Sequence, residues 1–578
     1  MFRFLFPSLL ATACAGAVTV WQPVVDPAIT VPGTRPDGAL FFSSYGQPSN
    51  FGGEIGFTPA RPARITAKDG ALVIAKGSSA EGLWASLAGP AGESDRTFDA
   101  GDLLGIGGLP ASRVPVTAVA VDVKGKGKLR VQIGDVKRVP LWSGELTVDS
   151  TESTRLRLPF DAKLAAKAKF LSFTVPPETE ITLRRMGFEA EKPDIEPADW
   201  LFRISLGKLR RCLDPQSGLT AARAHTGKGR FLALPGSGMN ALATAIAAKQ
   251  GLIDPKQAAD EVRVTARTLL AINQSHGFLP HFANREPDGR VERSEKTEYS
   301  SVDTALTLQG LLLAADVLEL NDTAEAVRQR IRSIDWSGMI DEKGFPHHGY
   351  SSSTGQVLSG AYRGWGGEQA LTVLLEGMAR GDKAQGKLAT NGKIYRGVGF
   401  IAEIQSLFHP DFDRPEADRL SGISWPETRR RLANDQAGYF TKRKPECPAS
   451  KLGLWGLSAG EGGMPGAAYA ANGCDLPDLT WIHPHYPVMA CMSDPARLEQ
   501  VIGAFEKAGL LFPRGLPETV SIDGVRYNPM QCSLNASFET LAAYHAWKRP
   551  SGQDVVDQAS LADPLIRMGM RRFYTQAP

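Results

Sequence analysis

Two patterns of hydrophobic and polar residues divide the chain near residue 190. Before it, short segments rich in Val, Ile, Leu and Thr are separated by Gly and Pro, and several alternate strictly, as at 129–133. Alternation places apolar side chains on one face of a strand. Strands are expected at 71–76, 114–124, 128–134, 151–160, 170–175 and 180–185. Short strands with frequent turn residues predict an antiparallel β-sandwich over residues 35–190.

The polar stretch 189–199 contains two prolines and predicts a linker, after which apolar residues recur at helical spacing. Twelve helices are expected, at 200–213, 239–251, 254–274, 301–320, 322–335, 367–380, 400–407, 425–440, 481–492, 495–511, 534–547 and 563–573. The helix at 302–318 is apolar almost all round, whereas 323–334 carries one apolar stripe. Alternation of inner and outer helices predicts an all-α (α/α)6 toroid over residues 198–578. An open helical solenoid is the alternative, but no fixed repeat period is present.

Composition adds one exclusion. The 578 residues are 42% hydrophobic and 22% charged, as in an ordinary folded protein. With 65 Lys+Arg and 62 Asp+Glu, the net charge is +3. So small a charge on so long a chain gives no electrostatic case for binding nucleic acid.

The first 20 residues indicate export. A basic residue at Arg3 precedes a short apolar run, which is too short to span a bilayer but fits a signal peptide. The sequence Ala-Thr-Ala-Cys ending at Cys14 also resembles a lipoprotein cleavage box. The expected location is periplasmic or secreted, with an outer-membrane lipid anchor at Cys14 as one form. A monomer or dimer is expected.

The remaining cysteines and the histidines do not show the spacing of a zinc site, so no metal and no cofactor are expected. Five cysteines follow Cys14, and an odd number leaves at least one thiol free in an oxidising compartment. Cys447 and Cys474 flank a Gly-rich segment and are the first candidates for a disulfide.

Three junctions between loops and helices gather acidic and aromatic residues. The first, 298–306, brings Glu298 and Asp303 to the start of the apolar helix. Ser300 and Asp303 also have capping-box spacing, so helix capping alone explains an acid there. The functional alternative places Asp303 at the mouth of the toroid.

The second junction, 362–371, places Glu368 after Trp365 and two glycines. Dipole stabilisation again explains an acid at a helix start, but it does not explain the glycines beside a tryptophan. Glycines permit close approach of a ligand, and an indole face suits the C–H surface of a sugar ring.

The third junction, 455–463 followed by 478–485, contains Trp455, Glu461 and Asp478. A Gly-rich loop of this kind is explained equally well as a tight turn. A phosphate cradle is a poor fit, because neither the lysine nor the strand of a P-loop is present.

Together these segments resemble a known family. Residues from about 200 to the end are similar to the bacterial glucoamylase-like (α/α)6 family, which includes the endo-β-1,2-glucanases of glycoside hydrolase family 144. The matching segments occur in the family's order, at 277–282, 298–306, 364–368, 433–436, 455–461 and 478–480. The resemblance covers about two thirds of the chain and rests on the number and order of the segments.

The resemblance implies a glycoside hydrolase acting on a β-glucan, with a cleft at the toroid mouth. The family's glutamate after the glycines is a candidate general acid, here Glu368, and its aspartate in the cleft is here Asp303. The family's pattern also has an acid before the last inner helix, whereas 531–536 reads Gln-Cys-Ser-Leu-Asn-Ala. Either another acid substitutes or the linkage differs.

Hydrolysis of a glycosidic bond needs one protonated carboxyl and one ionised carboxylate. We therefore expect Glu368 as acid and Asp303 as base or sugar-holder, with inversion favoured by family analogy. The residues expected to bind an oligo- or polysaccharide substrate are Glu298, Trp365, His281, Arg363, Trp455, Glu461 and Asp478, with Glu298 and Glu461 as reserve carboxylates.

Two other functions fit the same sequence. A polysaccharide lyase would use a Tyr or His base and a cation that neutralises a uronate carboxylate, and the available residues are Tyr299, His281, His347, His348 and Arg363. A non-catalytic glycan-binding protein fits the missing carboxylate at 531–536.

Overall fold

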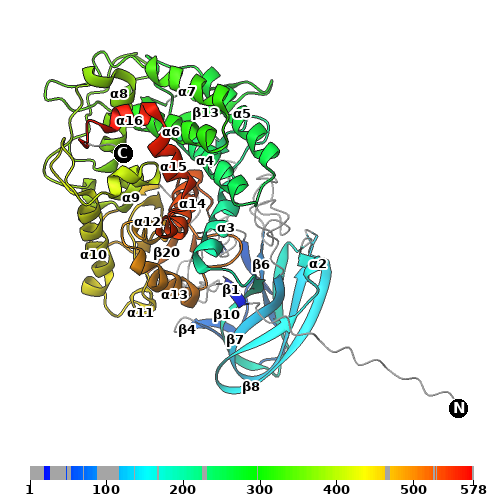
Figure 1. The fold of residues 1–578 in the computed structure, drawn as a ribbon. Helices are drawn as coiled ribbons and strands as arrows, with labels where there is room; N and C mark the ends of the chain where they lie inside the picture. Colours follow the sequence, from blue (N-terminus) through cyan, green and yellow to red (C-terminus); the bar gives the residue numbers. More distant parts are fainter. Residues whose placement is uncertain are drawn as a thin grey trace.

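The structure is a computed structural model, in which an antiparallel sheet is followed in the chain by a larger helical region (Figure 1). It describes residues 18–25, 47–48, 54–68, 71–87, 116–135, 137–165, 168–223, 231–295, 297–462, 469–524, 527–528 and 530–575. Cys14 and most of the expected signal segment lie outside these ranges.

The N-terminal sheet contains ten strands in the order β2-β3-β6-β9-β7-β10-β5-β4, with β1 beside β10 and β8 beside β7. Their bounds are β1 Val18–Val25, β2 Gln47–Pro48, β3 Glu54–Thr58, β4 Ile65–Lys68, β5 Ala71–Ile74, β6 Glu81–Ser86, β7 Val116–Gly134, β8 Pro140–Pro159, β9 Phe170–Val175 and β10 Glu180–Lys192. A short helix, α2, covers Ala162–Ala165. The prediction of a two-sheet sandwich is therefore wrong, since all ten strands belong to one curled antiparallel sheet.

The long strand β7 explains why the sheet is continuous. Its first half pairs with β10 and its second half with β9, so it joins both sides of the sheet. Gly125 and Gly127 lie between these halves with φ of 120° and 138°, and the register shifts beside Gly125. The sequence predicted a turn here, but the glycines bend a strand instead of ending it.

The boundaries of the sheet also differ from expectation. β1 begins at Val18, inside the expected signal segment and before the expected domain start at 35, and Val18 pairs with Lys192. β10 extends to Lys192, so the first residues of the predicted linker are strand. The connection to the helical region is short, because α3 begins at Pro197.

The helical region follows the predicted helices closely at most positions. The bounds are α3 Pro197–Arg210, α4 Leu234–Lys249, α5 Pro255–Ala271, α6 Ser301–Val317, α7 Asn321–Arg332, α8 Gly367–Arg380, α9 Gly399–Glu403, α10 Trp425–Arg443, α11 Pro448–Leu452, α12 His485–Ala490, α13 Leu498–Ala508, α14 Ser533–Lys548, α15 Val555–Ala562 and α16 Pro564–Met570. The sequence missed α11 and α15, and it predicted α12 too long.

Short 3-10 turns and small sheets connect these helices. The 3-10 turns are η2 Gly381–Lys383, η3 Tyr395–Gly397, η4 Ile404–Leu407, η5 Pro410–Asp413, η6 Pro495–Arg497 and η7 Arg549–Ser551. The strands are β11 Thr220–Ala221, β12 Leu232–Ala233, β13 Phe282–Arg285, β14 Val291–Arg293, β15 Tyr299–Ser300, β16 Gly349–Tyr350, β17 Ala459–Glu461, β18 Tyr469–Ala471, β19 Trp481–Ile482, β20 Thr519–Ser521 and β21 Tyr527–Asn528. These turns and strands lie in the segments that connect the helices.

Six helices contact one another in a closed ring. α4 packs on α6, α6 on α8, α8 on α9, α9 on α12, α12 on α14, and α14 on α4. α3, α5, α7, α16, α10 and α13 each pack on the outside of one or two ring members. α4, α6 and α14 are buried along almost their whole length, which explains why their sequences lack a polar face.

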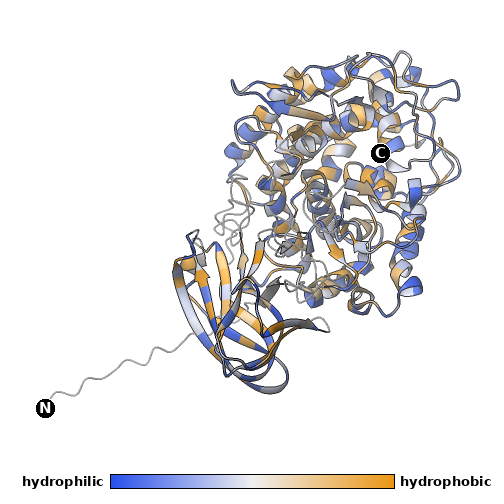
Figure 2. Cartoon of the chain, turned by 180° about the vertical axis from the view of Figure 1, so that it is seen from behind, coloured by the Kyte–Doolittle hydropathy of each residue, from blue (hydrophilic) through white to orange (hydrophobic). Residues whose placement is uncertain are grey.

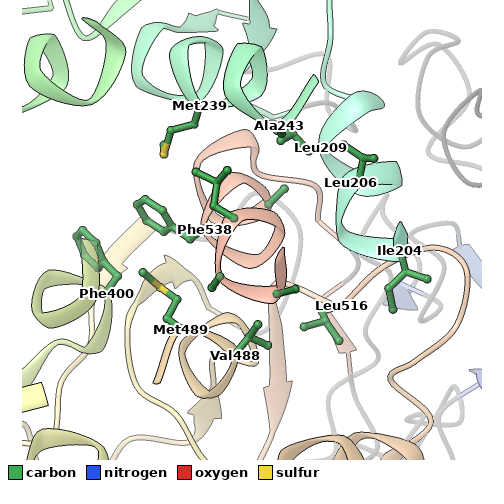
Figure 3. Close-up of a cluster of buried hydrophobic side chains, with 14 of the residues drawn as sticks. Ile204, Leu206, Leu209, Met239, Ala243, Phe400, Val488, Met489, Leu516 and Phe538 are labelled. Carbon is green, nitrogen blue, oxygen red and sulfur yellow. The ribbon is translucent and has the colours of Figure 1, made fainter. Parts of the chain in front are cut away.

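The centre of the ring is filled by apolar side chains. In Figure 3, Phe400, Met489 and Phe538 lie on one side of α14, and Ile204, Leu206 and Leu209 of α3 lie on the other. The rings of Phe400 and Phe538 stack with their centroids 5.4 Å apart. Polar colours gather on the outer helices and on the loops (Figure 2). The ring is therefore a packed core whose open end is closed by loops.

Two further expectations can be compared with the structure. Cys447 and Cys474 are both free thiols, so the predicted disulfide is wrong. Cys447 directly precedes α11, with its Sγ 2.9 Å from Ser450 Oγ, whereas Cys474 packs against the turn at Gly397. Within the described residues, every helix is too short or too polar to cross a bilayer.

Candidate active site

A pocket of about 430 Å³ opens where the N-terminal ends of α6, α8 and α14 meet. Its lining residues are His281, Glu298, Ser300, Val302, Asp303, Leu306, His348, Leu358, Tyr362, Trp365, Glu368, Phe400, Ala459, Tyr469, Leu534 and Phe538. A larger hollow of about 640 Å³ lies between α5 and the β13–β14 hairpin. It holds a single acid, Glu292, which pairs with Arg290, so the α6–α8–α14 pocket is the better candidate for chemistry.

Asp303 lies in the first turn of α6, as predicted, and only 7% of its surface is exposed. Ser300 caps this helix, since its hydroxyl accepts the backbone N–H of Asp303 at 3.2 Å. The capping explanation therefore applies to Ser300. The carboxylate of Asp303 does not cap the helix and is directed to the pocket instead.

Glu368 lies in the first turn of α8 and faces the same pocket. The chain enters this helix through Gly366, whose φ of 61° favours glycine, and a side chain at Gly367 would collide with Gln405. The pKa of Glu368 is raised to about 8, chiefly by burial and in part by the negative charge of Asp303, while His281 opposes both. Glu368 is therefore protonated at neutral pH despite its position at a helix start.

His281 is the cation nearest to the pocket acids. Its Nδ1 lies 3.3 Å from Asp303 Oδ2 and 3.5 Å from Glu298 Oε1. Burial alone would lower its pKa, but Asp303, Glu298 and Glu368 outweigh that effect and raise it. The hydrogen bond to His281 in turn lowers the pKa of Glu298. The pocket thus contains one acid with a raised pKa beside two further acids that both contact the same histidine.

Aromatic rings form one wall of the pocket. Trp365 stacks on Tyr395 with ring centroids 4.0 Å apart and 6° between the planes. Tyr362 and His348 meet Trp365 edge-on at 5.7 and 5.3 Å. Because the neighbours fix the orientation of the indole, its half-buried face is a rigid surface for a sugar ring.

Four of the predicted binding residues lie outside the pocket lining. Arg363 is exposed and pairs with Asp341 at 2.5 Å, and Asp478 is an exposed loop residue with φ of 53°. Trp455 is buried against Tyr486. Glu461 is buried behind the pocket, where it pairs with Arg223 at 2.8 Å. Proximity in sequence to a Gly-rich loop therefore did not predict whether a residue lines the pocket or lies elsewhere.

Glu461 belongs to a second, largely buried group of charges that sequence reasoning missed. Lys208 of α3 pairs with Glu539 of α14 at 2.7 Å, and both side chains are buried. Glu518 is also buried, and burial raises its pKa to about 8 against the opposing effect of Lys208. We call Lys208, Arg223, Glu461, Glu518 and Glu539 the inner cluster. Glu518 follows a plain Leu-Pro sequence, so the local pattern gave no signal for it.

The pocket also presents atoms that could hold a metal ion. One ligand atom from each of His281, Glu298 and Asp303 lies within 4.8 Å of the other two. The long contacts to His281 fit an imidazolium between two carboxylates equally well. A protonated His281 offsets one of the two negative charges of Glu298 and Asp303.

Comparison with known proteins identifies the fold. No protein-family profile and no curated protein sequence matches this chain. Among solved structures, a β-1,2-glucanase from Parabacteroides distasonis matches with a TM-score of 0.55 and 12% identity, over 91% of this chain and 98% of that one. A candidate glucoamylase from Bacteroides uniformis matches with a TM-score of 0.55 and 16% identity, over 66% and 98%.

A third structure, the endo-β-1,2-glucanase from Chitinophaga pinensis, matches with a TM-score of 0.52 and 16% identity, over 65% of this chain and 97% of that one. The match over 91% of the chain reaches beyond the helical region, whereas the two matches near 65% correspond in extent to that region alone. The protein therefore shares its fold with bacterial endo-β-1,2-glucanases and candidate glucoamylases.

Proposed function

We propose that this protein is a glycoside hydrolase that cleaves a β-glucan in the pocket between α6, α8 and α14. The closed ring of inner helices with outer partners supports an (α/α)6 toroid, and the pocket occupies one end of it. The observation that carries the proposal is Glu368, a carboxyl held protonated at neutral pH beside Asp303 and a rigid indole. A β-1,2-linked glucan is the first substrate to test, since proteins that share the fold are named for it.

In the proposed reaction, Glu368 donates its proton to the glycosidic oxygen as the bond to the anomeric carbon breaks. Asp303 acts on the opposite side, where it accepts a proton from the attacking water. The water adds to the anomeric carbon, so the configuration inverts. His281 holds the Asp303 carboxylate in place, and its positive charge limits the rise in the pKa of Glu368.

Product analysis tests the proposal. The protein is incubated with a panel of β-glucans that includes linear and cyclic β-1,2-glucan, and new reducing ends are followed together with the anomeric configuration by NMR. Shorter glucans with inverted configuration are expected. An unsaturated product that absorbs ultraviolet light would show a lyase, and binding without turnover would show a glycan-binding protein.

We also propose that the protein is exported to the periplasm or secreted, with a lipid anchor at Cys14 as one form of export. The support is the basic and apolar start of the sequence. Fractionation of cells that express the wild type and Cys14→Ser tests both points. Loss of membrane partitioning in the variant is expected, whereas unchanged partitioning would exclude the anchor and leave simple secretion.

A further inference from the structure

Tyr469 is the pocket residue whose role the sequence did not indicate. It is the first residue of β18, directly opposite Glu461 of β17, and 38% of its surface is exposed. Its hydroxyl lies 3.4 Å from Asn535 Oδ1 of α14. Tyr469 therefore connects the open pocket to the buried first turn of α14.

The side-chain amide of Asn535 is held in one orientation. Its Nδ2 donates one hydrogen bond to the backbone oxygen of Ala459 at 3.1 Å and another to Glu518 Oε1 at 2.6 Å. A backbone carbonyl can only accept, and Glu518 Oε1 also accepts the backbone N–H of Glu461. Flipping the amide would bring its oxygen against both acceptors. Since Asn535 is fully buried, water cannot compensate for that change.

The fixed orientation of the Asn535 amide determines whether the Tyr469 hydroxyl donates or accepts a hydrogen bond. Asn535 Oδ1 can only accept, so Tyr469 is the donor in this 3.4 Å contact and its hydroxyl proton points toward Asn535. The remaining lone pairs of the phenol oxygen are available on the pocket side. Although a tyrosine hydroxyl can ordinarily donate or accept, this one faces the pocket as an acceptor.

We infer that Tyr469 is a specificity-determining residue that accepts a hydrogen bond from one hydroxyl group of the bound glucan. The inference rests on the proposed function and adds to it the chemical character of one contact. An acceptor of fixed polarity selects a sugar with a donor at that position over a sugar that carries none. Asn535 is a positioning residue, since it acts through Tyr469.

The first test removes only the phenol oxygen. Tyr469→Phe keeps the ring, and its partly exposed position makes the variant safe for folding. We expect kcat/KM on linear β-1,2-glucan to fall about 5- to 150-fold, because a substrate hydroxyl is left without a partner. Tyr439→Phe is the matched control. Tyr439 lies in α10, and its hydroxyl donates to the backbone oxygen of Leu476, outside the pocket lining. Full activity of Tyr469→Phe would overturn the inference and leave the proposed hydrolase intact.

The second test distinguishes an acceptor from a donor. Sophorotriose is compared with derivatives in which one hydroxyl at a time is replaced by hydrogen or by fluorine, which cannot donate. At one position, both replacements should reduce wild-type kcat/KM by the factor seen for Tyr469→Phe, with no further loss in that variant. Tolerance of fluorine at every position, or fully additive losses, would contradict an acceptor role.

A measurement without substrate separates this inference from the proposed function. 3-Fluorotyrosine is placed at position 469 and its phenol is titrated by ¹⁹F NMR in the wild type and in Asn535→Leu, after thermal melting has confirmed that the variant is folded. Loss of the acceptor should lower the pKa of the phenol. An unchanged phenol pKa would overturn the hydrogen-bond direction even if the glucan is cleaved. Absence of turnover with a lowered pKa would instead defeat the hydrolase.

Discussion

The pocket acids and the inner cluster contain the same chemical groups but neutralise them differently. In the pocket, Glu368 and Asp303 lie near the half-buried His281, which is the basic residue that acts on Glu368 among the described residues. In the inner cluster, lysine and arginine pair directly with Glu539 and Glu461 at 2.7 and 2.8 Å. Lys208 lowers the pKa of Glu539, but burial outweighs this effect and raises that pKa to about 7. Burial likewise raises the pKa of Glu518 to about 8, so the raised pKa of a carboxyl does not by itself separate the two groups. The pocket acids line a cavity, whereas Lys208, Glu518 and Glu539 are almost fully buried, so we expect chemistry in the pocket and a supporting role for the inner cluster.

The largest expected effect is a loss of turnover when the pocket acid Glu368 is replaced. Glu368→Gln keeps the size of the side chain but removes the proton donor, so turnover of the natural glucan should fall about 10²- to 10⁴-fold. The loss should shrink for an activated aryl glycoside, whose leaving group needs no proton. Steady-state kinetics measure both. Glu499→Gln, at the exposed first turn of α13, is the control for a simple change of charge.

Full turnover by Glu368→Gln would end the assignment of this residue as the acid. If the carboxyl served only the helix dipole, the variant would lose at most about 1 kcal/mol of stability and keep its activity.

Substitutions in the inner cluster should reduce the stability of the fold. Glu539→Leu leaves the Lys208 ammonium buried without its partner, which should reduce the free energy of unfolding by about 3–5 kcal/mol. Denaturant unfolding measures the change. The double variant Lys208→Met/Glu539→Leu should recover most of it, because apolar side chains can replace a buried pair. An unfolding free energy equal to that of the wild type in Glu539→Leu would contradict a supporting role.

The electrostatic link between Asp303 and Glu368 predicts a pH shift. Glu368 carries its proton below its pKa of about 8, so general-acid activity should be present below that pH and disappear above it. The charge of Asp303 raises this pKa, and Asp303→Asn should therefore move the titration of Glu368 to lower pH. NMR of ¹³C-labelled glutamate carboxyls follows the titration directly, with Glu368→Gln identifying the signal. A titration at unchanged pH would show that the two acids do not interact.

The smallest expected effect concerns the aromatic wall. Trp365→Ala removes the indole that stacks on Tyr395, and KM should rise about 2- to 10-fold with kcat less affected. Trp455→Phe tests the corresponding buried tryptophan outside the pocket, and it should lower the melting temperature and leave KM unchanged. A rise in KM for Trp455→Phe alone would reverse the distinction between pocket and core.

Local patterns predicted the elements better than their arrangement. The strand 170–175 and the helix 367–380 have the predicted bounds, because period and boundary residues are encoded nearby. The β-sandwich prediction failed because Gly125 and Gly127 are compatible with a turn or with a bent strand, and only the pairing of β7 decides between them. Pairing partners lie far away in sequence and leave no local trace.

The site shows the same limit. Asp303 and Glu368 were proposed because they lie in segments that resemble the glucoamylase-like family, since the helix dipole alone also explains an acid at a helix start. Trp455 was expected to bind substrate but is 7% exposed, since a tryptophan beside glycines fits a core or a cleft equally well. Tyr469 and Asn535 were missed because their importance depends on a hydrogen-bond chain across 66 residues.

Closure of the helical ring requires contacts between helices that the ribosome makes at very different times. α3 is the first helix of the ring's outer layer to be made, but its partner is α14, and the Lys208–Glu539 pair spans 331 residues. At about 5–20 residues per second, a ribosome needs roughly 20–70 s to supply that partner. During that interval Trp200 and Phe202 lack the surface that finally buries them. α3 is therefore synthesised long before α14, the helix on which it makes most of its contacts.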